Sequence, residues 1–277
     1  MSDAQVRPTG NGDAGPGCTA PIDELLDRAV AAINQGDRAA GTALAQQVLA
    51  ADGMNAEAED LLVAPAEPGE IRRLTILFAD LVDSTGLATR VEPETYRMLV
   101  GRYSQQVLSI VNRFEGHISA HQGDGLLAVF GHPTAHEDDA CRAVLAGLEI
   151  TRQVARLYEQ ARRRVRVGGS VRGGVHRGLV YLDTAHGDVY GLAANVAARV
   201  SSLAPPDTVV VSAAVEPLVR ARFELQARPP AGVKGVEGPI AHHQVIGERI
   251  EPVRVGRGPL VGRDREVAHL QGCWARA

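Results

Sequence analysis

The stretch LTILFADLVDST at residues 74–85 decides the fold of most of this chain. Its first six residues, Leu74–Ala79, form a short apolar run that predicts a buried strand. Asp80 ends this run, and the residues after it predict a short turn that leads into a helix. A carboxylate at a strand end can bind a hard cation, and the backbone N–H groups of a turn at Ser84 and Thr85 can hold phosphate oxygens. Because an ordinary helix cap has the same pattern, this segment alone permits both interpretations.

Strands and helices alternate on the C-terminal side of this stretch. The pattern predicts helices over Pro93–Phe114, Ala135–Gln160 and Gly191–Leu203, the second with Glu137, Asp138 and Asp139 in its first turn. It predicts strands over His117–His121, Leu126–Phe130, Val165–Val175, Leu179–Leu182, Thr208–Ser212 and Ala241–Val245. The order strand–helix–strand–strand–helix–strand, with additions, predicts an α+β fold with a ferredoxin-like sheet.

The N-terminal part of the chain has a different pattern. Residues 1–20 are expected to be a disordered leader, and residues 21–64 a helical hairpin similar to a tetratricopeptide fragment. Helices are predicted over Ile22–Asn34, Ala39–Ala51 and Ala56–Leu62, with a linker at residues 65–70 before the main domain at 71–247. The hairpin is expected to be a packing or dimerisation element. The tail, residues 248–277, resembles the start of a P-loop ATPase module, although no GxxxxGK[ST] motif follows.

Composition narrows the class of protein. The net charge is −4 and the pI is near 6.1, which argues against a basic nucleic-acid binder. Three widely separated cysteines without CxxC spacing suggest neither disulfides nor a zinc site, as is usual in a reducing cytosol. No apolar run approaches the ~20 residues of a membrane span. We therefore expect a cytoplasmic protein that binds neither nucleic acid nor membranes.

A second acidic centre lies at Gly123-Asp124-Gly125, between two predicted strands. Glycine and aspartate form turns without any function, so this motif alone favours a plain hairpin. If the first strand of the sheet pairs beside this hairpin, Asp80 and Asp124 fall at the same edge. With no Lys or Arg expected between them, two such carboxylates would repel each other unless a cation were bound. The natural occupants are two Mg²⁺ or Mn²⁺ ions.

A third centre is the pair Asn195 and Arg199 in the predicted helix Gly191–Leu203. Residues four apart lie on one face of a helix, and the rest of this helix is small and apolar. An amide and a guanidinium on one face suit a substrate with hydroxyl and phosphate groups. The alternative is an exposed polar stripe without function.

Together these motifs resemble the catalytic domain of class III adenylate/guanylate cyclases. The matching segments are residues 78–85, Gly123-Asp124, residues 174–178, residues 188–191 and residues 195–199, and they occur in the family's order. The resemblance implies a two-metal reaction that converts ATP to cyclic AMP and pyrophosphate in a homodimer with shared sites. It assigns Asp80, Asp124 and the Leu81 carbonyl to the metals, Asn195 to the ribose and Arg199 to the α-phosphate. It further assigns Lys234 to the triphosphate and Asp188 to the adenine amino group.

One position departs from the family pattern. The family usually has a base-recognising lysine four residues before the second metal aspartate, where this chain has Ala120. Gln122 shares the face of Ala120 in a regular strand and is a candidate for the same contact with the purine. Two alternatives therefore stay open. One is a guanylate cyclase, against which Asp188 argues; the other is a nucleotide-binding regulatory or dimerisation domain with little or no turnover.

Overall fold

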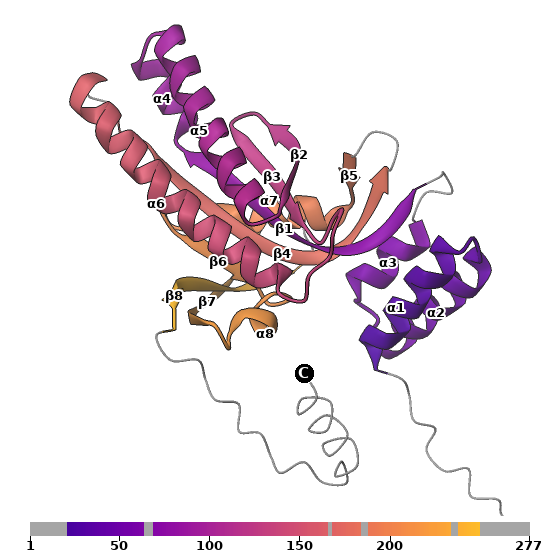
Figure 1. The fold of residues 1–277 in the computed structure, drawn as a ribbon. Helices are drawn as coiled ribbons and strands as arrows, with labels where there is room; N and C mark the ends of the chain where they lie inside the picture. The colour runs from indigo at the N-terminus through magenta and orange to yellow at the C-terminus, as the bar shows by residue number, and fades with distance from the viewer. Residues whose placement is uncertain (1–20, 64–68, 166–167, 184–187, 234–237, 250–277) are drawn as a thin grey trace, which may run out of the picture. The chain divides into compact units, whose positions relative to one another are not determined.

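The computed structural model describes residues 21–63, 69–165, 168–183, 188–233 and 238–249 (Figure 1). The chain forms two compact units, residues 1–72 with 181–186 and residues 73–180 with 187–277. The predicted leader lies outside the described residues, as do most of the predicted linker and the tail from residue 250 onward. Each unit is described by itself below.

The N-terminal unit contains three helices, α1 (Ile22–Asn34), α2 (Arg38–Ala51) and α3 (Ala56–Val63). They confirm the predicted helices to within one residue at each end. The Asp37 side chain caps α2 by accepting a hydrogen bond from the Ala40 N–H, at 3.0 Å. At the end of α1, the Asn34 amide donates to the Ile71 carbonyl (2.8 Å) and accepts from the Ile71 N–H (2.9 Å). One side chain thus satisfies both backbone groups of Ile71.

The second unit is built on a mixed sheet of eight strands, in the order β2-β3-β1-β4-β6-β8-β7 with β5 paired to β4 (Figure 1). The strands are β1 (Glu70–Val82), β2 (His117–Gln122), β3 (Gly125–Phe130), β4 (Ser170–Asp183), β5 (Asp188–Tyr190), β6 (Val209–Ser212), β7 (Phe223–Gly232) and β8 (Pro239–Glu248). The helices are α4 (Ser84–Arg90), α5 (Pro93–Arg113), α6 (Asp139–Val165), α7 (Leu192–Ser202) and α8 (Glu216–Val219). The predicted α+β fold with a βαββαβ core is confirmed.

The two faces of the sheet carry different helices. On one face, Leu77 and Ala79 of β1 join a large buried cluster with Tyr103 of α5 and Val154 of α6. On the other face, Val200 of α7 packs against Val210 of β6 in a smaller cluster. Since side chains alternate along a strand, Asp80 belongs to the face opposite that of Ala79, which is the face that α7 covers.

Several boundaries differ from those predicted. The strands predicted at Val165–Val175 and Leu179–Leu182 merge into one strand, β4, which begins only at Ser170 and passes through Gly178 without a break. Val165 is instead the last residue of α6. Helix α6 begins at Asp139, so Glu137 and Asp138 precede its first turn. Strand β7 was not predicted, because Pro229-Pro230 argues against a strand. It is the last strand of the sheet, where proline costs no ladder hydrogen bond on the open side, and its pairing with β8 is irregular between Arg228 and Ala231.

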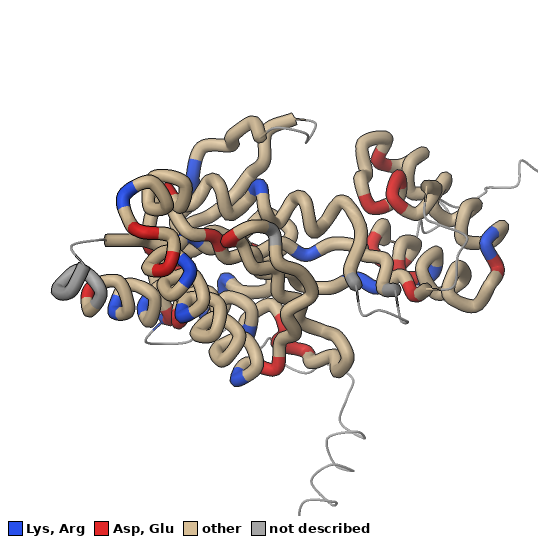
Figure 2. Tube along the Cα trace, turned by 90° about the horizontal axis from the view of Figure 1, so that it is seen from above, with Lys and Arg blue, Asp and Glu red and all other residues tan. Residues whose placement is uncertain are grey.

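Charged residues are distributed differently in the two units (Figure 2). Lys and Arg are interspersed with Asp and Glu over the sheet and its helices, whereas acidic residues predominate in α1–α3. In α3, burial and the neighbouring Glu57 and Glu59 raise the pKa of Asp60 to about 6. Among the described helices, none is both long and apolar enough to cross a membrane.

Candidate active site

Asp80 and Asp124 are brought to one edge of the sheet by the pairing of β1 with β3. Ala79 lies opposite Leu126 in this antiparallel ladder, so Asp80 is one residue beyond the pair and Asp124 two residues before it. The β2–β3 hairpin turns through Gly123-Asp124, because Gln122 pairs directly with Gly125. Gly123 has a φ of +68°, a conformation that glycine adopts without steric cost. The predicted proximity of the two acidic segments is therefore confirmed at the level of strand register.

Asp80 has a partner that the sequence analysis did not anticipate. Arg172, in the neighbouring strand β4, donates to Asp80 Oδ2 from Nη2 at 2.9 Å and from Nε at 3.3 Å. Both side chains are mostly buried, 29% exposed for Arg172 and 21% for Asp80. Arg172 does not come from between the two carboxylates, because β4 lies on the side of β1 away from β3 and Asp124. The pairing of β1 with β4 spans 92 residues of sequence, so no local pattern could have revealed it.

The surroundings of Asp124 indicate a bound cation more strongly than those of Asp80 do. Its Oδ2 atom is buried and has no hydrogen-bond partner among the described residues. A buried carboxylate oxygen without a partner is energetically unfavourable, and a bound divalent ion would relieve that cost. No cluster of three or more His, Cys, Asp or Glu side chains forms a metal site in the described part of the chain. Carboxylate and carbonyl oxygens from few residues, completed by substrate phosphates, are typical of Mg²⁺ sites, so Asp80 and Asp124 fit such an ion.

Three tyrosines lie close to the two carboxylates. Tyr103 of α5 is fully buried and donates from its hydroxyl to the Ala79 carbonyl at 3.0 Å, next to Asp80. Burial, then Asp80, then Asp124 and Tyr158 raise the pKa of Tyr103 well above its usual value. Burial, followed by Tyr96 and Asp124, raises the pKa of Tyr158 to about 12. These tyrosines therefore stay neutral, and Tyr103 fixes the backbone of β1 immediately before Asp80.

The turn after Asp80 is held by Asp83. This residue has a φ of +55°, and its carboxylate forms an ion pair with Arg90 at the end of α4. Its carbonyl accepts from the Leu87 N–H at 2.8 Å, and α4 begins at Ser84. Ser84 and Thr85 thus lie in the first turn of α4 itself and not in a turn before the helix.

Helix α7 presents Asn195 and Arg199 on its exposed side, one turn apart, while Ala193, Ala194, Ala197 and Val200 are buried. The backbone of α7 lies directly on β4 at Gly174. A Cβ atom added at Gly174 would come within 2.2 Å of the Ser201 nitrogen. The glycine therefore allows this close approach, and it sets the position of α7 against the sheet.

For the remaining predicted residues, the structure describes some side chains, only the backbone of others, and not Lys234. The Leu81 side chain is buried at the end of β1, and Ala120 pairs with Leu127 in β2. For Gln122 and Asp188 the structure describes the backbone, in β2 and β5 respectively. Lys234 lies outside the described residues. The roles assigned to Leu81, Gln122, Asp188 and Lys234 therefore stay predictions.

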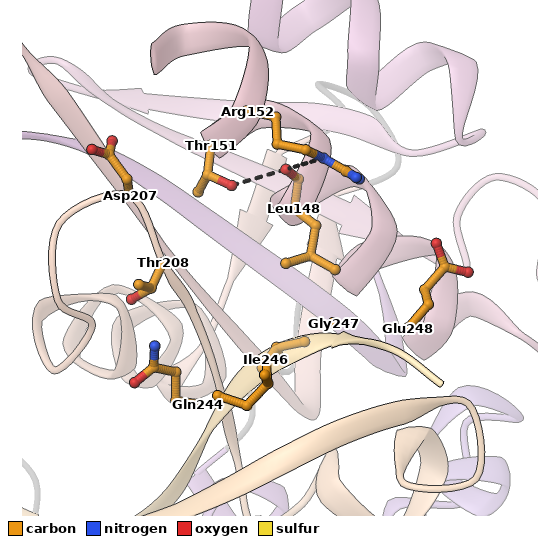
Figure 3. Close-up of a pocket in the computed structure, with 10 residues that line it drawn as sticks. Leu148, Thr151, Arg152, Asp207, Thr208, Gln244, Ile246, Gly247 and Glu248 are labelled. Atoms are coloured by element: carbon orange, nitrogen blue, oxygen red, sulfur yellow. Dashed lines mark hydrogen bonds between the residues drawn. The ribbon is translucent and has the colours of Figure 1, made fainter. Parts of the chain in front are cut away.

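A cavity of about 400 Å³ lies between α6, the residues before β6, and β8 (Figure 3). Arg152, Asp207 and Glu248 line it, together with the side chains of Thr151, Thr208 and Gln244. It contains none of the residues predicted for the active site, and no sequence motif marks the residues that line it.

Comparison with known proteins defines the class. Residues 67–247 match the family described as the adenylate and guanylate cyclase catalytic domain, and the chain belongs to this family. Two relatives named adenylate cyclase are each 33% identical to it. The one from Glutamicibacter nicotianae aligns over 57% of this chain and 36% of its own length; the one from Streptomyces coelicolor aligns over 54% and 35%. The chain thus spans about a third of the length of these relatives.

Solved structures share the fold. The adenylyl cyclase CyaB from P. aeruginosa superposes with a TM-score of 0.62 at 22% identity, over 66% of this chain and 98% of its own. The guanylyl cyclase Cya2 superposes with a TM-score of 0.61 at 25% identity, over 67% of this chain and 97% of its own. The aligned structures thus include cyclases named for either nucleotide, so the fold alone does not select the base.

Proposed function

We propose that the protein is an adenylate cyclase that converts ATP to 3′,5′-cyclic AMP and pyrophosphate as a homodimer. The observation that carries this proposal is the buried, unpartnered Oδ2 of Asp124 at the same sheet edge as Asp80, within a cyclase catalytic domain. The two relatives named adenylate cyclase favour ATP as the nucleotide. So does Asp188, whose carboxylate would accept a hydrogen bond from the adenine amino group.

Asp80, Asp124 and the Leu81 carbonyl would hold two divalent ions, Mg²⁺ or Mn²⁺. When bound, such ions stabilise negative charge on phosphate oxygens and lower the pKa of the attacking hydroxyl. In the reaction, the ribose 3′-oxygen bonds to the α-phosphorus, and the bond from that phosphorus to the pyrophosphate oxygen breaks. The 3′-hydroxyl proton is released, and no protein group is assigned as its acceptor.

The other residues bind and orient the nucleotide. Arg199 would stabilise the charge that develops on the α-phosphate, and Asn195 would orient the ribose. Lys234 and the backbone N–H groups at Ser84 and Thr85 would hold the triphosphate. In the proposed homodimer, the aspartates of each site come from one subunit and the Asn195–Arg199 pair from the other, across a two-fold axis.

Arg172 adds a charge near the metal carboxylates. Before a metal binds, its guanidinium satisfies Asp80. With ions bound at the carboxylates, the same guanidinium would be free to bind a phosphate oxygen, for which its planar array of donors is well suited.

Ala120 favours a second candidate function. Without a lysine at this position, one expected contact to the base is missing, as in a nucleotide-binding regulatory domain with little turnover.

If Gln122 does not replace it, losing one contact worth about 1–3 kcal/mol narrows the preference for ATP over GTP by about ten- to a hundredfold.

Turnover of ATP and GTP with Mn²⁺ and with Mg²⁺, for the unaltered protein and for Ala120→Lys, tests the proposal. We expect a modest preference for ATP that Ala120→Lys sharpens. Strong ATP selectivity in the unaltered protein would assign the base contact to another group, with Gln122 first. A higher rate with GTP would make the protein a guanylate cyclase. No turnover of either nucleotide by the dimer would support the regulatory domain.

A further inference from the structure

Asp207 occupies a position at which the backbone alone would favour glycine. It lies in the connection between α7 and β6, and its φ is +58°, in the left-handed region. Glycine adopts this conformation more readily than any residue with a Cβ atom, although aspartate tolerates it better than most. The side chain of Asp207 is therefore expected to contribute something that glycine could not.

The side chain and backbone of this connection hold the start of β4. The Val171 N–H donates to Asp207 Oδ1 at 3.1 Å, and the Asp207 N–H donates to the Val171 carbonyl at 2.8 Å. One residue further along, the Gly173 N–H donates to the Thr208 carbonyl at 3.0 Å. Regular pairing of β4 with β6 begins only at Gly173 and Val209. Asp207 lies before Val209, the first residue of β6. Its hydrogen bonds therefore extend the pairing of β4 back to Val171.

The residue between these two anchoring points is Arg172. Its guanidinium donates hydrogen bonds to Asp80. On one side of it, the N–H and the carbonyl of Val171 both bond to Asp207; on the other side, the Gly173 N–H bonds to Thr208. Val171 is fully buried, so removing the carboxylate would leave its N–H buried without this acceptor and would loosen the start of the strand. Asp207 and Thr208 also line the cavity of Figure 3, so both are adjacent to open volume and not packed on every side.

We propose that Asp207 is a positioning residue for the reaction, because it fixes the backbone from which Arg172 reaches Asp80. The proposal deepens the proposed function and rests on it. Asp207 touches neither the nucleotide nor the metals in this scheme; it acts through Arg172. Small displacements of a group that binds charge at a reacting centre cost large factors in rate, so the effect of losing Asp207 is expected at the active site.

Three variants of this connection test the proposal. Asp207→Gly keeps the backbone conformation and removes the carboxylate. Asp207→Asn keeps an oxygen that can accept from the Val171 N–H, and Thr208→Ala is the matched control. The Thr208 hydroxyl donates only to the Pro205 carbonyl, at 2.8 Å, so its loss removes a hydrogen bond from the same turn and leaves those to β4 in place.

Two readouts distinguish positioning from general damage. With ATP, we expect Asp207→Gly to lower kcat/KM about tenfold, while Asp207→Asn and Thr208→Ala stay within about threefold of the unaltered protein. Without nucleotide, calorimetric titration with Mn²⁺ should show tighter binding in Asp207→Gly, because a loosened Arg172 competes less well for Asp80. Arg172→Ala should tighten Mn²⁺ binding further. A variant that is merely less well folded would lose turnover and Mn²⁺ affinity together.

The double variant Arg172→Ala, Asp207→Gly completes the test. Once Arg172 is absent, Asp207→Gly should change Mn²⁺ affinity less than twofold, because the group that it positions is gone. An equal effect of Asp207→Gly in both backgrounds, or no effect on either readout in a folded protein, overturns the proposal. Because the Mn²⁺ titration needs no turnover, it decides the role of Asp207 even if the protein converts neither nucleotide.

Discussion

The two acidic residues of the site have different surroundings, and this difference decides which of them gives the cleaner experiment. Asp80 accepts two hydrogen bonds from Arg172, whereas Asp124 has a buried oxygen without a partner in the described chain. Replacing Asp80 would also deprive Arg172 of its acceptor. Replacing Asp124 removes a buried oxygen that has no partner among the described residues.

We therefore predict opposite effects of Asp124→Ala on activity and on stability. Turnover should be abolished, while the free energy of unfolding in EDTA should stay the same or rise by up to about 1–3 kcal/mol, because an unsatisfied buried oxygen is removed. Adding Mn²⁺ should raise the melting temperature of the unaltered protein but not of the variant. The exposed Asp138→Ala serves as the control that keeps the response. Near-normal Mn²⁺-dependent turnover in Asp124→Ala would show the metal assignment to be wrong.

His176 of β4 predicts a dependence of stability on pH. Burial lowers its pKa to about 4, and its Nδ1 atom lies 2.9 Å from the Ser212 hydroxyl. Since the folded-state pKa lies below the unfolded value of ~6.5, the unfolded state binds the proton more tightly. Stability is fully present above about pH 6.5 and is lost as the pH falls toward 4, with a slope approaching ~1.4 kcal/mol per pH unit.

Denaturant unfolding at several pH values between 4 and 7 measures this slope. His176→Gln should flatten it, while His121→Gln, at an exposed position, should leave it unchanged. An unaltered slope in His176→Gln would assign the acid sensitivity to other groups.

At the scale of elements, Gly174 is a point of close backbone contact between β4 and α7. We predict that Gly174→Ala destabilises the fold by about 1–3 kcal/mol or more, because the new methyl group would overlap the backbone at Ser201. It should also lower turnover, since α7 carries Asn195 and Arg199. Gly101→Ala in α5 is the matched control: a Cβ there meets nothing within 4 Å, so a gain of about 0.5–1 kcal/mol is expected. Thermal and denaturant unfolding should show Gly174→Ala to be less stable, and Gly101→Ala more stable, than the unaltered protein. Similar stabilities of the two variants would contradict the close packing of α7 on β4 at Gly174.

The elements also show how far the sequence could be interpreted. Periodicity and glycine breaks located α1–α3, and the apolar run before Asp80 located β1, since these signals are local. The register between β2 and β3 could also be predicted, because a tight turn at Gly123-Asp124 leaves few ways to pair the two strands. Arg172 and Asp207 were missed because their contacts join segments 92 and 36 residues apart. Strand β7 was missed because an edge position tolerates the prolines that a central strand excludes.

At the scale of the whole molecule, the proposed homodimer predicts complementation. Asp80→Ala and Arg199→Ala should each be inactive alone, since each removes a different half of a site shared by two subunits. Mixing them should restore part of the activity, because a mixed dimer has one site with both defects and one with neither. Turnover after co-refolding or subunit exchange measures the recovery. No recovery, with mixed dimers shown to form, would mean that each site lies within one chain.

The contact of α7 with Gly174 restricts how such an assembly can move. Because there is no room for even a methyl group between the helix and β4, any movement that keeps this contact carries α7 and the strand that bears Arg172 together. In the proposed homodimer, a rotation of one subunit against the other could change the shared sites and leave this contact intact.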